Sequence, residues 1–255
     1  MDSGVGGLSV YQEIKQNLPN AQLHYFADHE ASPYGEKEEQ WLLSRICSCT
    51  EQLIDSIHPD IIVLACNTAS TLALPALREL TSIPIIGVVP AIKTAASATR
   101  NNAIGILATP VTVDSPYLTT LIDEFAANHS VTNVGSSQLV KMAEQKLSGI
   151  PVDANELKTI LRPIIESGCD SVVLGCTHFP LLKSELTELY PNINWIDSGK
   201  AIANRTVTVM RELNISNPTN NSIGEEYFYS SGKSLTPLRT HLSNLGFQDI
   251  QTIQV

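Results

Sequence analysis

The chain has 255 residues, of which 43% are hydrophobic and 16% are charged, a composition typical of a soluble globular protein with a sizeable core. Its formal net charge of −10 argues against a nucleic-acid partner, because binding phosphates requires a basic surface. The sequence has no run of 18 apolar residues and no signal peptide, so we expect a cytoplasmic protein without a membrane partner. Five cysteines, an odd number, fit reduced thiols better than disulfides.

Strands and helices alternate along the chain. Short apolar runs predict strands, and apolar residues at helical spacing predict helices between them. The expected strands cover 23–27, 61–65, 85–88, 103–107, 131–134, 172–175, 194–196, 226–229 and 250–255. The expected helices cover 8–18, 38–57, 70–80, 91–98, 117–125, 139–147, 153–166, 181–189, 200–213 and 236–245, with loops at 109–114 and 216–222. In the helix 38–57 we expect Trp41, Ile46, Leu53, Ile54 and Ile57 in the core. The alternation predicts an α/β fold with mainly parallel sheets covered by helices on both faces.

The series of elements repeats, and the repeat predicts two pseudo-symmetric domains. The stretch IIVLACNTAST at 61–71 has a counterpart 110 positions later, SVVLGCTHFPLL at 171–182, in which Cys176 takes the place of Cys66. Ligands of open parallel sheets bind beyond the carboxyl ends of the strands. We therefore expect a first domain of 1–90 plus 207–255 and a second domain of 91–206, with the active site in the cleft between them and one thiol on each wall.

Two thiols in a cleft suggest metal, redox or proton-transfer chemistry. A structural metal needs three or four closely spaced ligands, and neither Cys66 nor Cys176 has enough cysteine or histidine neighbours in the sequence. Redox exchange is disfavoured because the chain has no C-x-x-C pair. Cys47 and Cys49 are two residues apart on a helix and point to different sides, so one is expected in the core and the other partly exposed.

Proton transfer fits the pattern better. A free thiol has a pKa of about 8.5, and a following helix N-terminus increases its thiolate fraction. Two thiols on opposite sides of a chiral carbon could remove its proton from one side and return one from the other, with no cofactor and no metal. The glycine-rich segment at 2–7 offers backbone N–H groups to a carboxylate. It is not a dinucleotide fingerprint, because Ser9 stands where the third glycine would be.

Four ordered motifs resemble those of one known family. They are DSGVGGLSV from residue 2, PYGEK from residue 33, ACNTAS from residue 65 and GCTHFPLL from residue 175. The chain is similar over essentially its whole length to glutamate racemases, which are cofactor-independent amino-acid racemases of bacteria. The resemblance implies two α/β domains with the active site between them. It also implies interconversion of L- and D-glutamate for peptidoglycan synthesis.

The resemblance also assigns the site residues. Cys66 and Cys176 match the two catalytic thiols, and Asp2 and His178 match the side chains that assist them, one on each side. The substrate-contacting pairs match Asp2-Ser3, Tyr34-Gly35, Asn67-Thr68 and Thr177-His178. Glu144 falls where the family carries a further acidic residue near the pocket; an exposed helix face is the alternative. By the same resemblance, Cys66 acts on D-glutamate and Cys176 on L-glutamate.

The chain departs from the family at its start. Members normally carry an apolar strand just before the DSG motif, whereas this sequence begins at Met1-Asp2. The internal repeat agrees, because the strand 103–107 precedes the matching loop. About five residues of strand span some 16 Å, so we expect the first domain to lack a central strand. Restoring an apolar N-terminal strand is predicted to raise stability and activity, and equal melting temperature and turnover would refute this.

Three functions remain open from the sequence. The first is a two-base glutamate racemase, and the second is a racemase of another substrate, such as aspartate or a hydantoin. The third is a catalytically impaired binding or regulatory homologue, to which the missing strand lends weight. Some family members respond to a cell-wall precursor as activator, and the sequence leaves that response open here. It also leaves open whether the protein is a monomer or a homodimer.

Overall fold

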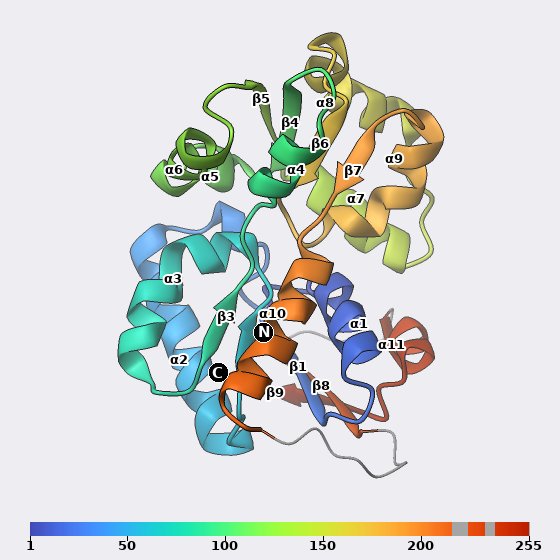
Figure 1. Ribbon diagram of the computed structural model, residues 1–255. Coiled ribbons are helices and arrows are strands. Elements are labelled where there is room, and N and C mark those ends of the chain that lie inside the picture. Colours follow the sequence, from blue (N-terminus) through green and yellow to red (C-terminus); the bar gives the residue numbers. More distant parts are fainter. Residues whose placement is uncertain (216–223, 233–237, 255) are drawn as a thin grey trace. The chain divides into compact units, whose positions relative to one another are not determined.

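A computed structural model of the chain describes residues 1–215, 224–232 and 238–254 (Figure 1). The loop expected at 216–222 lies outside these residues. The chain divides into two compact units, unit 1 with Met1–Val88 and Gly199–Val255, and unit 2 with Val89–Ser198. The boundary predicted at residue 206 falls inside the helix α10 (Gly199–Glu212), whereas the division in the structure falls just before this helix and keeps it whole.

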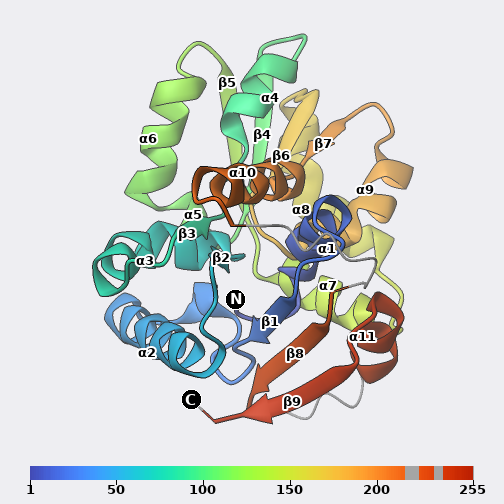
Figure 2. The ribbon, with the colours of Figure 1, turned by 60° about the horizontal axis from the view of Figure 1, so that its bottom comes forward.

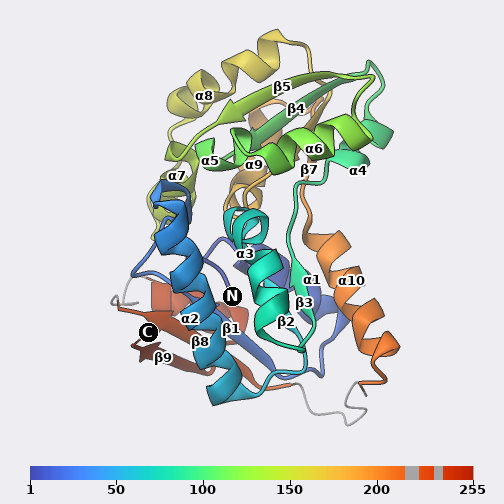
Figure 3. The same ribbon diagram turned by 90° about the vertical axis from the view of Figure 1, so that its left-hand side faces the viewer.

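Unit 2 is built on a four-stranded parallel sheet of order β5-β4-β6-β7. Its strands are β4 (Ala103–Ala108), β5 (Ser130–Gly135), β6 (Ser171–Leu174) and β7 (Asn194–Ile196). Its helices are α4 (Ile92–Ala98), α5 (Pro110–Val113), α6 (Pro116–Phe125), α7 (Gln138–Leu147), α8 (Ala154–Glu166), the 3₁₀ turn η2 (Phe179–Leu182) and α9 (Lys183–Leu189). One apolar cluster joins α7, α8 and α9 to one face of the sheet, and a second joins α4 and α6 to the other face. Figure 3 shows α8 and α6 on opposite sides of β4 and β5. The central strand β4 is therefore buried on both faces, which explains its unbroken apolar sequence.

Unit 1 has the same kind of layering, but its sheet is divided. Three strands pair in parallel in the order β1-β8-β9, and β2 pairs in parallel with β3 in a separate two-stranded sheet (Figure 2). The strands are β1 (Leu23–Ala27), β2 (Ile62–Leu64), β3 (Ile85–Gly87), β8 (Glu226–Ser231) and β9 (Asp249–Ile253). The helices are α1 (Leu8–Asn17), η1 (Tyr34–Glu36), α2 (Glu39–Ile57), α3 (Asn67–Leu80), α10 and α11 (Arg239–Leu245). Apolar clusters place α2 and α3 on one face and α1 with α10 on the other.

The first two residues connect the two sheets of unit 1. The amino group of Met1 donates a hydrogen bond to the Val63 carbonyl at 3.0 Å, and the Ala65 N–H donates to the Met1 carbonyl at 2.7 Å. On the other side, Asp2 forms a parallel bridge to Ala27 at the end of β1. Met1 and Asp2 thus lie between β1 and β2 as the last residues of a central strand would (Figure 2).

The α/β class and the parallel sheets are confirmed, and several local expectations need correction. Helix α3 begins at Asn67 rather than at residue 70, because Cys66 already occupies its N-cap position. The loop expected at 109–114 contains the short helix α5, which opens at Pro110, a favourable first helical residue. Trp41, expected in the core, is 50% exposed because it lies in the first turn of α2, away from the apolar stripe. Among the described residues, no helix is both long and apolar enough to cross a bilayer.

Candidate active site

In unit 1 the thiol of Cys66 lies at the junction of a strand and a helix. β2 ends at Leu64, and Cys66 has extended backbone angles at the N-cap of the 14-residue helix α3. The helix dipole places partial positive charge at this end, which favours a thiolate over a thiol. Cys66 is 6% exposed and carries no disulfide. The local sequence thus delivers a buried single thiol to the start of a helix.

Asn67 follows this thiol and has an orphaned polar atom. Its side chain is 3% exposed, and its Oδ1 atom has no hydrogen-bond partner among the described residues. A buried amide oxygen without a partner costs about 1–3 kcal/mol, so such groups are rare unless a ligand or water satisfies them. The Asn67 amide is therefore available to a ligand donor beside Cys66.

Asp2 is held by the glycine-rich segment. Its Oδ2 atom accepts hydrogen bonds from the N–H groups of Gly4 and Gly7, both at 3.1 Å. A β-carbon on Gly7 would stand 2.9 Å from the Asp2 β-carbon and 3.0 Å from that of Ala65, so only glycine allows this approach. The fully buried carboxylate is thus fixed at the start of α1. The N–H groups that the sequence offered to a substrate carboxylate include two that Asp2 already occupies.

Tyr34 is also held by a buried network. Its hydroxyl donates to Oδ2 of Asp28 at 2.9 Å, and Arg45 donates to both oxygens of the same carboxylate, from Nε at 3.0 Å and from Nη2 at 2.7 Å. Burial alone would raise the pKa of Asp28, but the hydrogen bonds from Arg45, Ser231 and Tyr34 outweigh it and lower the pKa. This network fixes the segment that carries Tyr34.

Met1, Tyr34 and Cys66 belong to one buried cluster of unit 1, and the Ala65 N–H beside Cys66 donates to the Met1 carbonyl. Burial raises the pKa of Tyr34 well above its usual value, and the charges of Asp28, Cys49 and Cys66 raise it further. Burial lowers the pKa of the Met1 amino group from 8.0 to about 6, against the opposing influence of Asp2 and Cys66. The structure therefore gathers Met1, Asp2, Tyr34 and Cys66 in one part of unit 1.

In unit 2 the thiol of Cys176 begins a chain of polar contacts. Its Sγ atom lies 3.9 Å from Nδ1 of His178, and Nε2 of the same imidazole lies 3.2 Å from Oε1 of Glu144. The His178 side chain is 3% exposed and that of Glu144 is 39% exposed. A carboxylate that accepts a hydrogen bond from one ring nitrogen fixes the orientation of an imidazole. It also stabilises the charged imidazolium that forms when the other ring nitrogen takes a proton. The arrangement can pass a proton between the thiol and a group that water reaches.

Secondary structure explains why Glu144 meets His178. Cys176 follows β6, and the turn η2 starts directly after His178. Helix α7 packs on this turn and is fixed there by Lys146, which donates to the Leu181 carbonyl at 2.8 Å and pairs with Glu185 at 2.8 Å. Of the two readings of Glu144, the contact with His178 favours the residue near the site over the exposed helix face.

The remaining predicted residues lie beside these groups along the chain. Ser3, Thr68 and Thr177 are each 5% exposed, and Gly35 is half-buried next to Tyr34. Ser3, Gly35 and Thr68 belong to unit 1, and Thr177 belongs to unit 2. Among the described residues, no group of three or more His, Cys, Asp or Glu side chains could hold a metal ion.

Some contributors to the site have little or no signal in the sequence. Asp28 directly follows β1, a position where polar residues of parallel sheets gather, so it could have been found. Arg45 lies 17 positions away on α2, and nothing in its surroundings in the sequence points to Asp28. Tyr25 is another such case, because its hydroxyl donates to the Gly4 carbonyl at 2.9 Å from the middle of an apparently apolar strand.

A family model described as Asp/Glu/hydantoin racemase matches residues 4–206 of the chain, which include both thiols and all four sequence motifs except Asp2 and Ser3. The chain belongs to this family. The family match confirms the resemblance stated from the four motifs. The protein is a member of a family of isomerases.

Several relatives of the chain are named glutamate racemase. The chain is 43% identical over 257 residues to a protein named glutamate racemase from Shewanella sp. (strain MR-7), covering 99% of this chain and 94% of the relative. It is 50% identical over 220 residues to glutamate racemase from Photorhabdus laumondii, covering 84% of this chain and 75% of the relative. It also matches the crystal structure of Escherichia coli glutamate racemase in complex with L-glutamate and the activator UDP-MurNAc-Ala. That match has a TM-score of 0.92 and 41% identity, and it covers 100% of this chain and 96% of the other.

Proposed function

We propose that this protein is a glutamate racemase that interconverts L- and D-glutamate with Cys66 and Cys176 as its two bases. The observation that carries the proposal is the equivalent placement of the thiols. The N–H of Ala65, before Cys66, donates to the Met1 carbonyl at 2.7 Å, and the N–H of Gly175, before Cys176, donates to the Leu107 carbonyl at 2.7 Å. Each thiol therefore follows the same register position of a parallel sheet.

The reaction requires one thiol at each face of the α-carbon. One cysteine, as thiolate, takes the α-proton, and the electron pair of the C–H bond passes to the carbanion beside the carboxylate. The other cysteine, as thiol, donates its proton to the opposite face, so the configuration inverts and the two cysteines exchange protonation states. No redox change occurs, and the net balance is one proton removed and one returned.

The other groups have distinct roles in this proposal. The Asp2 carboxylate assists Cys66, and His178 assists Cys176 with Glu144 as its positioning partner. The orphaned Oδ1 of Asn67 accepts a hydrogen bond from the substrate ammonium, which supplies the partner that the described residues lack. Ser3, Tyr34, Gly35, Thr68 and Thr177 complete the substrate contacts.

Deuterium exchange tests the proposal. D-glutamate and L-glutamate are incubated separately with the protein in deuterium oxide, and loss of the α-proton and optical rotation are followed. We expect exchange with inversion in both directions. Cys66→Ala and Cys176→Ala should each lower racemisation by about 10³-fold or more, in the range of a lost general base. Cys66→Ala should abolish α-proton loss from D-glutamate, and Cys176→Ala that from L-glutamate.

A matched control and three alternative outcomes make the test decisive. Cys47→Ala removes a half-buried thiol of α2 and should leave exchange unchanged. Exchange that survives both cysteine substitutions in both directions would exclude the two-thiol mechanism. Reaction with aspartate but not glutamate would indicate a racemase of another substrate, and no reaction with either would favour a binding homologue.

Activation by a cell-wall precursor is a second, separate part of the proposal. It is supported by the 41% identity to the Escherichia coli enzyme, whose crystal structure contains the activator UDP-MurNAc-Ala. We expect this compound to raise turnover of the present protein, measured with D-glutamate at fixed concentration, whereas UDP alone should not. Equal turnover with and without the compound would refute the proposed activation. The supply of D-glutamate for peptidoglycan, a cytoplasmic location and a monomeric or homodimeric state stay predictions.

A further inference from the structure

Tyr25 connects β1 to the glycine-rich segment of unit 1. Its side chain is 3% exposed, and its hydroxyl donates a hydrogen bond to the Gly4 carbonyl at 2.9 Å. The N–H of the same Gly4 donates to Oδ2 of Asp2 at 3.1 Å. Gly4 is therefore held by Tyr25 through its carbonyl, and it holds in turn the carboxylate that assists Cys66 in the proposed reaction.

The Tyr25 hydroxyl also lies against Gly7, whose N–H is a second donor to Asp2. A β-carbon on Gly7 would stand 2.9 Å from the Tyr25 hydroxyl oxygen and 2.9 Å from the Asp2 β-carbon. The Gly7 N–H donates to Oδ2 of Asp2 at 3.1 Å. The two glycines that bind the Asp2 carboxylate are thus both next to the Tyr25 hydroxyl, so its removal affects both hydrogen bonds.

The register of β1 brings the hydroxyl to this place. Asp2 forms a parallel bridge to Ala27. Its N–H donates to the Phe26 carbonyl, and its own carbonyl accepts from the Asp28 N–H, both at 2.9 Å. Side chains two positions apart lie on the same face of a strand, so Tyr25 lies on the face of Ala27. β1 therefore holds the Asp2 main chain directly and the Asp2 side chain through Tyr25.

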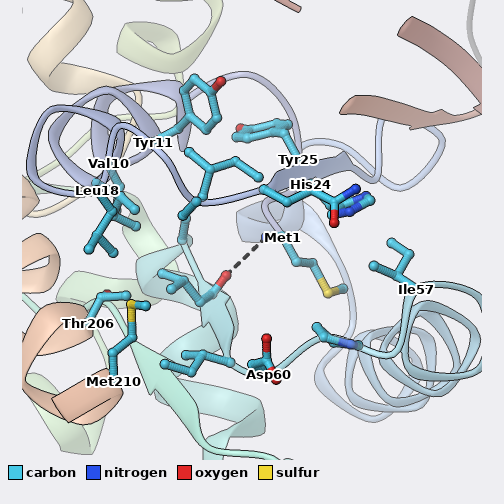
Figure 4. A pocket seen from close by; sticks show the side chains of 18 of the residues that line it. Met1, Val10, Tyr11, Leu18, His24, Tyr25, Ile57, Asp60, Thr206 and Met210 are labelled. Atoms are coloured by element: carbon cyan, nitrogen blue, oxygen red, sulfur yellow. Dashed lines mark hydrogen bonds between the residues drawn. The ribbon is translucent and has the colours of Figure 1, made fainter. Parts of the chain in front are cut away.

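Aromatic contacts fix the Tyr25 ring without the help of its hydroxyl. The ring stacks on Phe228, with the centroids 5.1 Å apart and an angle of 12° between the planes. It also meets the rings of Tyr11 and Phe247 edge to face, at 6.1 Å and 6.3 Å between centroids. Figure 4 shows Tyr11 and Tyr25 beside one another near α1. The Tyr11 hydroxyl donates to Glu226 instead, so of these two tyrosines only Tyr25 bonds through its hydroxyl to the glycine-rich segment.

We propose that Tyr25 is a positioning residue for proton transfer at Cys66. Its hydroxyl holds the Gly4 carbonyl and thereby keeps the N–H groups of Gly4 and Gly7 on the Asp2 carboxylate. The inference rests on the proposed racemase function, in which Asp2 assists Cys66. In this role Tyr25 acts through Asp2 rather than on the substrate. Loss of the hydroxyl deprives a buried carbonyl of this donor, and the Asp2 carboxylate then loses its fixed position.

Tyr25→Phe tests the hydroxyl, because it keeps the stacked ring. We expect kcat to fall by about 5- to 10-fold with KM unchanged, the size of one lost hydrogen bond. Incorporation of para-aminophenylalanine at position 25 restores an N–H donor at the same place on the ring and should recover most of the loss in kcat. Tyr11→Phe is the matched control from the same aromatic cluster. It should lower the melting temperature, because Glu226 loses a buried partner, but leave kcat unchanged.

Isotope effects show at which thiol the change acts. The two enantiomers have equal free energies, so every variant lowers kcat/KM equally in both directions. With α-deuterated substrates, slower transfer at Cys66 makes removal of the deuteron from D-glutamate more rate-limiting. For L-glutamate, the same change makes the later return of a proton from Cys66 more rate-limiting. Tyr25→Phe should therefore raise the deuterium effect on kcat/KM for D-glutamate and lower it for L-glutamate, whereas a loosened structure around both thiols would shift both effects alike.

Hydrogen exchange gives a measurement that does not require activity. The amides of Gly4 and Gly7 should exchange faster in Tyr25→Phe than in the unsubstituted chain, and Tyr11→Phe should leave them unchanged. Unchanged exchange at both glycines, or isotope effects that shift in the same direction, would overturn the role of Tyr25. If the unsubstituted chain did not racemise glutamate, the proposed function would be refuted, and exchange at Gly4 and Gly7 would still decide whether Tyr25 positions Asp2.

Discussion

The two units carry equivalent thiols but surround them with different polar groups. Cys66 caps a helix, and the nearby Asp2 carboxylate is fully buried and held by two backbone N–H groups. Cys176 instead contacts His178, which leads to the 39% exposed carboxylate of Glu144. The repeat therefore specifies where each thiol lies, while the polar groups next to the two thiols differ between the units.

The anchors of the two half-sites differ in burial. In unit 1, Asp28 is 0% exposed and its partner Arg45 is 14% exposed. In unit 2, Lys146 and Glu185 are 30% and 28% exposed. Ion pairs that water reaches contribute little to stability, whereas removing one member of a buried pair leaves an uncompensated charge. The supports of unit 1 should therefore be the more sensitive to substitution.

The largest expected effect breaks the buried anchor. Arg45→Met should lower the free energy of unfolding by about 3 kcal/mol, because it leaves the Asp28 carboxylate buried without its bidentate partner. Lys146→Met, which removes the half-exposed anchor of unit 2, should cost about 1 kcal/mol or less. Urea unfolding of both variants at neutral pH measures the difference.

The double variant Asp28→Asn with Arg45→Met sharpens this comparison. Removing both charges should recover part of the loss, because no unpaired charge then remains. Equal losses for Arg45→Met and Lys146→Met, or no recovery in the double variant, would contradict the difference in burial as the cause.

The buried Met1 amino group should make the free energy of unfolding depend on pH, and unit 2 has no equivalent group. Burial lowers the pKa of the Met1 amino group from 8.0 to about 6, with Asp2 and Cys66 opposing this effect. The unfolded chain therefore binds more protons between these values, so stability rises as pH increases from about 6 to about 8. The free energy of unfolding should rise by about 3 kcal/mol over this pH range.

A variant that carries Ala-Ile-Gly-Ile directly before Met1 isolates this effect, because the Met1 nitrogen that bonds to the Val63 carbonyl then belongs to a peptide bond and carries no charge. In urea unfolding, the free energy of unfolding of the unextended chain should rise relative to that of the extended variant as pH increases from 6 to 8. His24 and His241, whose pKa values burial lowers, titrate with the same sign in both chains and cancel in the difference. A pH-independent difference would show that burial does not destabilise the charged Met1 amine.

The sequence predicted the strands, the helices and the positions of the two thiols better than the side-chain contacts around them. Strand runs that end at Cys66 and Cys176 carry a strong apolar signal and recur, so the class, the parallel strands and the paired thiols followed from local pattern. The burial of Trp41 was wrong, because helical spacing alone does not tell which of several apolar residues faces the sheet. The anchoring of Tyr34 by Asp28 and Arg45 joins three separate elements, and such pairing has no local signature.

Glu144 gives the smallest expected effect and tests the polar chain of unit 2. Glu144→Gln keeps an oxygen that can accept from His178 but removes the charge. Because this carboxylate is 39% exposed, water screens its interaction, and the loss should be about 1 kcal/mol or less. That corresponds to a fall in kcat of about 5-fold with KM unchanged, measured for both enantiomers of glutamate.

Glu156→Gln, on the exposed face of α8, should change neither constant. A fall in kcat beyond about 100-fold would make Glu144 a proton carrier rather than a positioning residue, and an unchanged kcat would return it to an exposed helix face.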